Sequence, residues 1–181
     1  MIEKKNAKDY LEESAIQLLS KKAVDKVSVS DICKNCNVST RTYYNYFKDK
    51  YDIINRCYFS RFEKYIAQRA NELTFEELML YLAEEVCKNP QFFRNVFGYT
   101  GQNNIRTGAS DSLCELLLYA IKVQSHKEPS EEEKTSMRFF TDGILAYVDK
   151  QLSKANIPSA IESATYCLNA IPDNLKKYIS H

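Results

Sequence analysis

The segment from Ser39 to Lys50 gathers side chains that can contact a nucleic acid. It opens with Ser39, Thr40, Arg41 and Thr42, whose side chains can all hydrogen-bond to phosphate oxygens or base edges. A guanidinium such as that of Arg41 can donate two parallel hydrogen bonds to the O6 and N7 atoms of one guanine. The pattern therefore predicts that one short element contacts bases as well as phosphates.

Aromatic and amide side chains extend this polar segment. Tyr44 and Tyr46 flank Asn45. A tyrosine hydroxyl can donate to a phosphate, and an asparagine amide can pair with adenine. Lys50 is expected in the first turn of the following helix, where its ammonium and free backbone N–H groups would bind one phosphate together. With the serine that starts the preceding helix, the expected DNA contacts are Ser28, Ser39, Thr40, Arg41, Thr42, Tyr44, Asn45, Tyr46 and Lys50.

Two short helices and an abrupt corner are needed to present these residues. The run Ser28-Val29-Ser30-Asp31 predicts a helix start, because the serine side chain can accept from backbone N–H groups and the aspartate favours the helix dipole. Asn37 tolerates the left-handed conformation that ends a helix abruptly. Ser39 then caps a second helix, from Thr40 to about Phe47. The expected result is a helix-turn-helix unit.

The rest of the chain also shows helical spacing of apolar residues. Asp49, Thr74, Ser130 and Ser159 are capping residues ahead of such repeats, and no alternating strand pattern is present. Residues 98–110 contain three of the four glycines and predict a loop or an irregular helix start. We therefore expect an all-α chain with about nine helices. Besides the two short ones, these are expected around 7–19, from 50 past 65, from 74, from 90, near 111–124, at about 131–155 and at 159–170.

Composition and charge exclude several classes of protein. Of the 181 residues, 44% are apolar, which is enough for a buried core. The longest apolar runs have six residues, far short of the about 20 that cross a bilayer. The amino terminus shows no apolar signal segment, so we expect a cytoplasmic protein that does not enter a membrane. Residues 1–69 carry a net charge of +5 and residues 70–181 a net charge of −4, which suggests a polyanion-facing amino-terminal module.

The cysteines raise the question of metal or redox chemistry. Cys33 and Cys36 form a C-x-x-C pair, which fits either a redox pair or half of a zinc site. A zinc site needs two more ligands, and the only histidines are His126 and His181. We therefore favour two buried thiols and expect no metal and no cofactor. No nucleophile–base pair and no paired carboxylates are evident, so an enzyme is not expected.

Positions 28–54 read S-V-S-D-I-C-K-N-C-N-V-S-T-R-T-Y-Y-N-Y-F-K-D-K-Y-D-I-I. This run resembles the tetracycline-repressor (TetR) family of bacterial one-component regulators, whose pattern is close to T-V-x-x-I-A-x-x-A-G-V-S-x-x-T-L-Y-x-H-F-x-x-K-x-x-L. Asn37 replaces the corner glycine, Tyr43 a leucine and Tyr46 a frequent histidine, while Cys33 and Cys36 fall on its two alanines. The matching residues are Ser28, Val29, Ile32, Val38, Ser39, Thr42, Tyr44, Phe47 and Lys50.

This resemblance implies a chain of two parts. Residues 1–50 would form a helix-turn-helix DNA-binding domain, and residues 51–181 a helical domain for dimerisation and regulation. The dimer would form through the helices at about 131–155 and 159–170, where the mid-helix Gly143 suits a close approach of two helices. The implied function is a transcriptional repressor that binds a near-palindromic DNA operator as a homodimer. A small-molecule effector or a protein partner would release it by favouring another conformation.

Alternatives stay open for function and for the effector site. The chain could be a TetR-like adaptor or coactivator that acts through a protein partner without sequence-specific DNA binding, since the positive charge of its amino-terminal part is modest. The acidic run 131–133 is expected to be a solvated helix start. An effector site stays unassigned, because aromatic residues at helical spacing pack in cores more often than they line cavities. The aromatic residues in question are Tyr81, Phe92, Phe93, Phe97, Tyr99, Tyr119, Phe139 and Phe140.

Overall fold

The computed structural model describes residues 6–69, 74–101 and 105–178, and its regular elements are all helices. No strand occurs within these ranges, which confirms the all-α prediction. No helix of the described chain is long and apolar enough to cross a membrane. In chain order the elements are α1 (Ala7–Leu19), η1 (Val24–Lys26), α2 (Val29–Asn35), α3 (Thr40–Tyr44), α4 (Lys50–Arg69), α5 (Phe75–Lys88), α6 (Pro90–Phe97), α7 (Ile105–Ser125), α8 (Glu131–Leu152), α9 (Ala160–Asn169) and η2 (Asp173–Tyr178).

The chain forms two compact units. The first comprises Met1–Glu63 and Pro90–Ile105, and the second Lys64–Asn89 and Arg106–His181. The first unit thus holds α1, α2 and α3 together with the start of α4 and all of α6. The second unit holds α5, α8, α9 and η2 with nearly all of α7.

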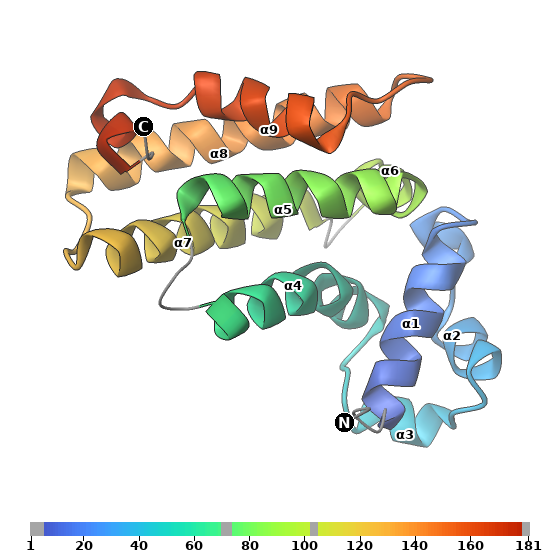
Figure 1. The fold of residues 1–181 in the computed structure, drawn as a ribbon. Coiled ribbons are helices and arrows are strands. Elements are labelled where there is room, and N and C mark those ends of the chain that lie inside the picture. Colours follow the sequence, from blue (N-terminus) through green and yellow to red (C-terminus); the bar gives the residue numbers. More distant parts are fainter. Residues whose placement is uncertain (1–5, 70–73, 102–104, 179–181) are drawn as a thin grey trace. The chain divides into compact units, whose positions relative to one another are not determined.

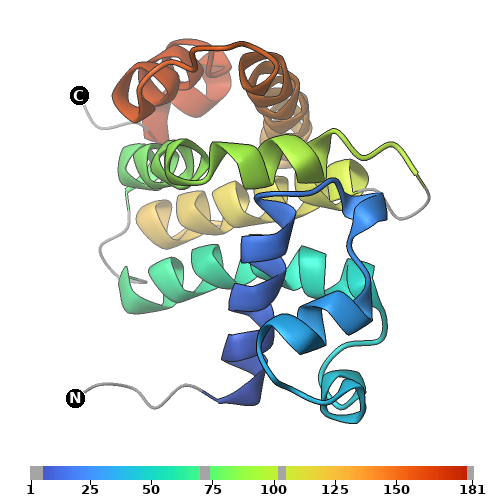
Figure 2. The same cartoon turned by 90° about the vertical axis from the view of Figure 1, so that its right-hand side faces the viewer.

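In the first unit, α1 contacts α2, α3 and α6, and α2 contacts α3. Figures 1 and 2 show α2 and α3 as short helices beside α1, with α3 near the first turns of α1. Leu11, Ala15 and Leu19 place the apolar stripe of α1 in a core that fully excludes water from all three side chains. Burial of apolar side chains is the main stabilising term for a unit of this size, because each removes a large apolar area from water.

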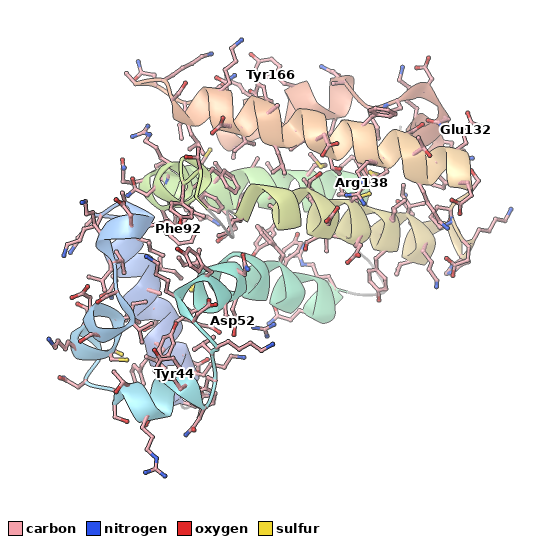
Figure 3. The ribbon with its side chains drawn as sticks, turned by 180° about the vertical axis from the view of Figure 1, so that it is seen from behind. Tyr44, Asp52, Phe92, Glu132, Arg138 and Tyr166 are labelled. Atoms are coloured by element: carbon pink, nitrogen blue, oxygen red, sulfur yellow. The ribbon has the colours of Figure 1, made fainter. Side chains whose placement is uncertain are left out.

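In the second unit, α5 packs along α9, and η2 packs on α8. Figure 1 shows α8 and α9 side by side, with α5 and α7 next to them. Phe75, Leu117 and Met137 come from three different helices, and none of their side chains is exposed. Polar contacts also join α7 to α8, because Ser110 donates to Asp142 and Arg138 pairs with Asp111. Figure 3 labels Arg138 on α8.

Local capping explains most of the helix starts. Ser28, Thr74, Ser130 and Ser159 each accept a hydrogen bond from the backbone N–H three residues later, as the sequence predicted. In all four cases the carboxylate of the acidic residue three positions later accepts a hydrogen bond from the backbone N–H of the capping residue. Two of the four orphan N–H groups at each helix start are satisfied in this way, so these boundaries depend on local sequence alone.

Three boundaries differ from the predictions. Helix α7 begins at Ile105 instead of near Asp111, because Ala109 and Ser110 are buried and their packing outweighs the weak helix propensity around Gly108. Helix α3 ends at Tyr44, and the residues up to Phe47 continue as a hydrogen-bonded turn. Helix α8 ends at Leu152, three residues before the expected end near residue 155. The short helix η2 was not predicted, because no cap marks its start.

Glu133 shows that the acidic start of α8 is only partly solvated, which corrects the expectation for run 131–133. Its side chain is 6% exposed. Its carboxylate accepts from the backbone N–H of Ser130 at 2.6 Å, the Tyr178 hydroxyl at 2.8 Å and the Lys177 ammonium at 2.7 Å. Lys177, followed by the hydrogen bonds from Ser130 and Tyr178, lowers the pKa of Glu133 from 4.5 to about 2. Glu133 therefore anchors η2 to the first turn of α8.

This anchor predicts an acid-dependent loss of stability. Because the folded-state pKa of Glu133 is depressed, its contribution is full above the ordinary carboxyl pKa of 4.5 and is lost as the pH falls toward about 2. We expect the urea midpoint of the wild type to fall across this range. The Glu133→Gln variant should have a lower midpoint at neutral pH and a flatter dependence on pH. Glu132→Gln, at an exposed neighbouring position, is the matched control; an equal effect of both variants would contradict the anchor.

Candidate nucleic-acid interface

A side-chain cap fixes the start of α2, and two backbone features form the corner between α2 and α3. Ser28 caps α2, and its hydroxyl donates to the Asp31 carboxylate at 2.6 Å. These bonds to Ser28 lower the pKa of Asp31. Asn37 has φ of 55°, the left-handed conformation predicted for it, and the backbone N–H of Val38 donates to the Cys33 carbonyl at 3.0 Å. The chain therefore turns sharply after α2 without needing glycine.

Helix α3 starts at its own cap. The Ser39 side chain accepts from the backbone N–H of Thr42 at 3.0 Å, and the two hydroxyls lie 2.8 Å apart. Both hydroxyls are thus held in a fixed pair at the front of the helix. Each oxygen still has capacity for a further hydrogen bond, since a hydroxyl can donate once and accept twice.

The exposed side of α3 carries most of the predicted contacts. Thr40, Arg41 and Asn45 are exposed, as are Tyr44 at 59% and Tyr46 at 47%. No ion pair or hydrogen bond engages the Arg41 guanidinium within the part of the chain that the structure describes. Figure 3 labels Tyr44 among the side chains of this helix. A polar helix front with an unengaged guanidinium has the chemistry needed to contact bases and phosphates.

Tyr43 lies on the opposite side of α3 and anchors it. Its side chain is fully buried, and its hydroxyl donates to the Asp49 carbonyl at 2.8 Å. The ring packs against Phe47, with centroids 5.3 Å apart. Burial raises the pKa of Tyr43, and the nearby Asp49 raises it further. A tyrosine is therefore accommodated where the family pattern has leucine, and it ties α3 to the turn before α4.

Removing this hydroxyl tests the anchor. Tyr43→Phe should lower the free energy of unfolding by about 1–2 kcal/mol, because the Asp49 carbonyl loses its buried donor while the ring still packs. Chemical denaturation followed by far-UV circular dichroism measures this change. Tyr44→Phe is the matched control, since its ring is largely exposed. If both variants unfold at the wild-type midpoint, the hydroxyl does not hold α3 in place.

The start of α4 differs in detail from the arrangement expected for Lys50. The Lys50 ammonium donates to the carbonyls of Val24 at 3.0 Å and Val27 at 3.4 Å. The backbone N–H groups of Tyr51 and Asp52 donate to the Asp49 carboxylate at 2.7 and 2.9 Å. The groups proposed to meet a phosphate are therefore largely engaged within the protein, and phosphate contact by Lys50 stays a prediction.

Side chains that the sequence reasoning missed hold α1 against α2. The Ser14 hydroxyl donates to the Ile32 carbonyl at 2.7 Å, and this contact is buried. The Asn35 amide donates to Ser14 and to Gln17, both at 3.1 Å. Small polar residues inside an apolar stripe are the only sequence signal for such a contact. These bonds fix the scaffold on which α3 is carried.

Helix α6 is a further support within the same unit. The Asn95 amide donates to the Leu19 carbonyl at the end of α1 at 2.7 Å. Beyond α6, the hydroxyls of Tyr99 and Tyr51 lie 2.9 Å apart and their rings stack. Residues distant in sequence thus contribute to the unit that carries α3.

The two cysteines of the C-x-x-C pair are free thiols in this unit. Cys33 is buried, and burial raises its pKa. Cys36 is half-buried and lies at hydrogen-bond distance from the Ile32 carbonyl. The geometry fits the buried-thiol interpretation better than reactive thiolates, which need a lowered pKa.

The aromatic residues proposed as alternatives for an effector site are divided between the two units. Phe92, Phe93 and Phe97 are buried and belong to the first unit, as does Tyr99. In the second unit, Phe140 lies in the core and packs on Phe75, Tyr81 stacks on Tyr65, and Tyr119 and Phe139 are exposed. Packing explains the buried members of the set without a ligand.

A comparison with known families gives a match over the amino-terminal part of the chain. Residues 12–57 match the model described as bacterial regulatory proteins, tetR family. The matched range includes α2, α3 and the start of α4, so it contains the predicted contact residues from Ser28 to Lys50. No curated protein matches the sequence.

Solved structures of similar fold are numerous. A dihydroxyacetone kinase operon activator, DhaS, matches with a TM-score of 0.73 and 20% identity, covering 96% of this chain and 98% of that chain. A TetR transcriptional regulator from Rhodococcus sp. RHA1 matches with a TM-score of 0.71 and 17% identity, covering 97% and 100%. The regulator FadR from Bacillus subtilis, solved with stearoyl-CoA, matches with a TM-score of 0.60 and 15% identity, covering 91% and 97%. At these identities the likeness establishes a shared fold.

Proposed function

From the membership of this chain in the tetR family of bacterial regulatory proteins, carried by residues 12–57, we propose that it represses transcription as a homodimer bound to a near-palindromic operator. The chain is a DNA-binding transcriptional regulator of that family, whose members are regulators and not enzymes. The observation that best supports the proposal is the exposed polar side of α3, held from behind by the buried Tyr43.

Individual side chains take different roles in this proposal. Arg41 pairs with guanine and Asn45 with adenine, because their donors match the major-groove edges of those bases. Tyr44 and Tyr46 donate to phosphates on either side of the groove. The hydroxyls of Ser39, Thr40 and Thr42 complete the contact surface with hydrogen bonds to the DNA sugar–phosphate backbone. The Ser28 hydroxyl already donates to the Asp31 carboxylate, so a phosphate contact by Ser28 stays a prediction.

Exposed apolar side chains on α8 and α9 support a homodimer. Phe139 on α8 is 74% exposed, Ile161 on α9 is 70% exposed, and Tyr166 on α9 is 53% exposed. Figure 3 labels Tyr166 on α9. Gly143 follows Phe139 at a spacing of four residues, so the two share one side of α8. Apolar side chains that water would otherwise solvate are typical of a surface that a second subunit covers.

Gly143 provides a test of this interface. Within one chain, a methyl group at Gly143 would meet no described atom within 4 Å, so Gly143→Ala should raise helix stability by up to about 1 kcal/mol. At a close helix–helix contact the same methyl should cost about 1–3 kcal/mol, which weakens the dimer roughly 5- to 150-fold. Sedimentation equilibrium measures the dimer dissociation constant.

Gly108→Ala is the matched control for Gly143→Ala. Gly108 also lies inside a helix, is exposed, and has no described atom within 4 Å of an added methyl group. We expect this variant to gain stability and to dimerise like the wild type. Equal dimer constants for the two variants would place Gly143 outside the interface.

Regulation by an effector extends the proposal. A small molecule or a protein partner that binds the second unit would release DNA if it favours a conformation with a different separation of the two α3 helices. The stearoyl-CoA bound to the similarly folded FadR indicates that an acyl thioester is a reasonable first ligand for screening. Release of a bound operator duplex by such a ligand is the measurement.

One observation favours the second candidate, an activator or adaptor. The structure with the highest TM-score among those described belongs to an operon activator, DhaS. A mobility-shift assay with the chain's own promoter region identifies an adaptor, and a reporter assay separates a repressor from an activator, which should raise transcription. A repressor should bind this duplex specifically and lower transcription from it in a reporter assay. An adaptor should show no steep salt dependence on DNA, because it releases no counterions from phosphates.

A further inference from the structure

We propose that Lys48, and not Lys50, is the lysine of the α3–α4 turn that neutralises a DNA phosphate, while Lys50 is a positioning residue. This assignment rests on the proposed DNA-binding function. It reverses the sequence-based expectation for Lys50, and it follows from the different surroundings of the two ammonium groups.

The Lys50 ammonium is engaged within the protein by partly buried hydrogen bonds. It donates to the carbonyls of Val24 at 3.0 Å and Val27 at 3.4 Å, residues at and just beyond η1. It also lies 5.3 Å from the centre of the Tyr51 ring, a distance suited to a cation–π contact. Two of its three protons therefore have carbonyl acceptors. Lys50 joins the link between α1 and α2 to the start of α4 and so holds the helix-turn-helix unit from both ends.

The first turn of α4 is also poorly suited to a phosphate. The Asp49 carboxylate accepts the backbone N–H groups of Tyr51 and Asp52, which are the donors an anion at a helix start would use. The Asp52 carboxylate accepts the backbone N–H of Lys48 at 2.8 Å. Two negative charges at this turn repel a phosphate that approaches the helix axis.

Lys48 has the free charge that this turn otherwise lacks. Its side chain is exposed, and no ion pair or hydrogen bond joins its ammonium to the residues that the structure describes. Its backbone is fixed by the bond to Asp52, one residue after the buried Phe47 and two after the exposed Tyr46. A flexible ammonium beside an exposed tyrosine can reach a phosphate at the edge of the groove while staying clear of the carboxylates.

The test compares the same substitution at both positions. Lys48→Met and Lys50→Met each remove an ammonium and keep an unbranched apolar side chain. Binding to a duplex from the chain's own promoter region and to a random duplex of the same length is measured by fluorescence anisotropy over a series of salt concentrations. The slope of log affinity against log salt counts the phosphates neutralised.

We expect Lys48→Met to reduce this slope by about 0.9 for each protomer and the affinity at 0.1 M salt by roughly tenfold for each protomer, with unchanged discrimination between the duplexes. Lys50→Met should keep the slope and lose discrimination, because α3 is no longer held in register. Lys50→Arg should restore discrimination, since a guanidinium can donate to both carbonyls. If Lys50→Met lowers the unfolding temperature and leaves the discrimination between the duplexes unchanged in the folded protein, Lys50 only stabilises the fold. That result would overturn the positioning role.

The opposite pattern overturns the proposal. If Lys50→Met reduces the slope and Lys48→Met does not, or if both reduce it equally, Lys50 contacts a phosphate. If the wild type binds neither duplex with a salt-dependent affinity, the proposed DNA-binding function itself is wrong, and the assignment fails with it.

Discussion

The Arg41→Ala variant is expected to bind the promoter duplex roughly 5- to 150-fold more weakly for each half-site than the wild type. This corresponds to about 1–3 kcal/mol for one bidentate contact with a base. The guanidinium is exposed at the second position of α3 and has no partner among the described residues. Its removal should therefore leave the stability of the fold unchanged, so that the variant loses only free energy of binding to DNA. Titration of the specific duplex measures the effect.

Arg41→Lys is the control that separates base reading from charge. It keeps the positive charge but loses the planar fork that matches one guanine. We expect it to bind a random duplex like the wild type and the promoter duplex like Arg41→Ala. If Arg41→Lys retains wild-type affinity for the promoter duplex, Arg41 contacts a phosphate and the specificity comes from other residues. Wild-type binding by Arg41→Ala would exclude Arg41 from the interface.

The Leu175→Ala variant should lose about 2–5 kcal/mol of unfolding free energy, the usual cost of a cavity left by leucine in a packed core. Leu175 lies in η2, has no exposed surface, and belongs to the core of the second unit with Phe75 and Met137. A loss of this size is a large part of the stability of an ordinary domain. Urea denaturation followed by circular dichroism measures it.

Lys176→Ala is the matched control, because this neighbouring side chain is exposed on the same short helix. We expect it to unfold within about 0.5 kcal/mol of the wild type. A small effect from Leu175→Ala would mean that η2 is not part of the core. The anchoring role assigned to Glu133 would then also fail, since both residues hold the same segment.

Features that depend on near neighbours were the ones that the sequence predicted well. The caps at Ser28, Ser39 and Ser130 act over three residues, so their side chains and the N–H groups they bind can be read from one short run. The left-handed Asn37 follows from the same local logic, because asparagine tolerates that conformation better than most residues. These local signals place α2 and α3, and with them the polar side chains of the candidate interface.

Features that depend on distant partners were not predicted. The acceptors of Lys50 lie 23 and 26 residues earlier in the chain, and no local pattern announces them. Helix η2 has no cap, and what holds it is the burial of Leu175 together with the bonds to Glu133. Helix α7 starts early because Ala109 is buried, which overrides the helix-breaking tendency of Gly108. Tertiary contact decides each of these cases, and the sequence alone does not reveal which surfaces meet.

The measurement that tests the role of α3 most directly is a methylation-protection footprint with dimethyl sulfate on the promoter duplex. The reagent attacks the N7 atom of guanine in the major groove, one of the two atoms that Arg41 is proposed to contact. We predict protection of guanine N7 in two half-sites about 10 base pairs apart, lost in the Arg41→Ala variant at the guanine it contacts. Protein bound to the duplex without any protected guanine N7, or with protection unchanged in Arg41→Ala, would contradict a recognition helix that begins at Ser39.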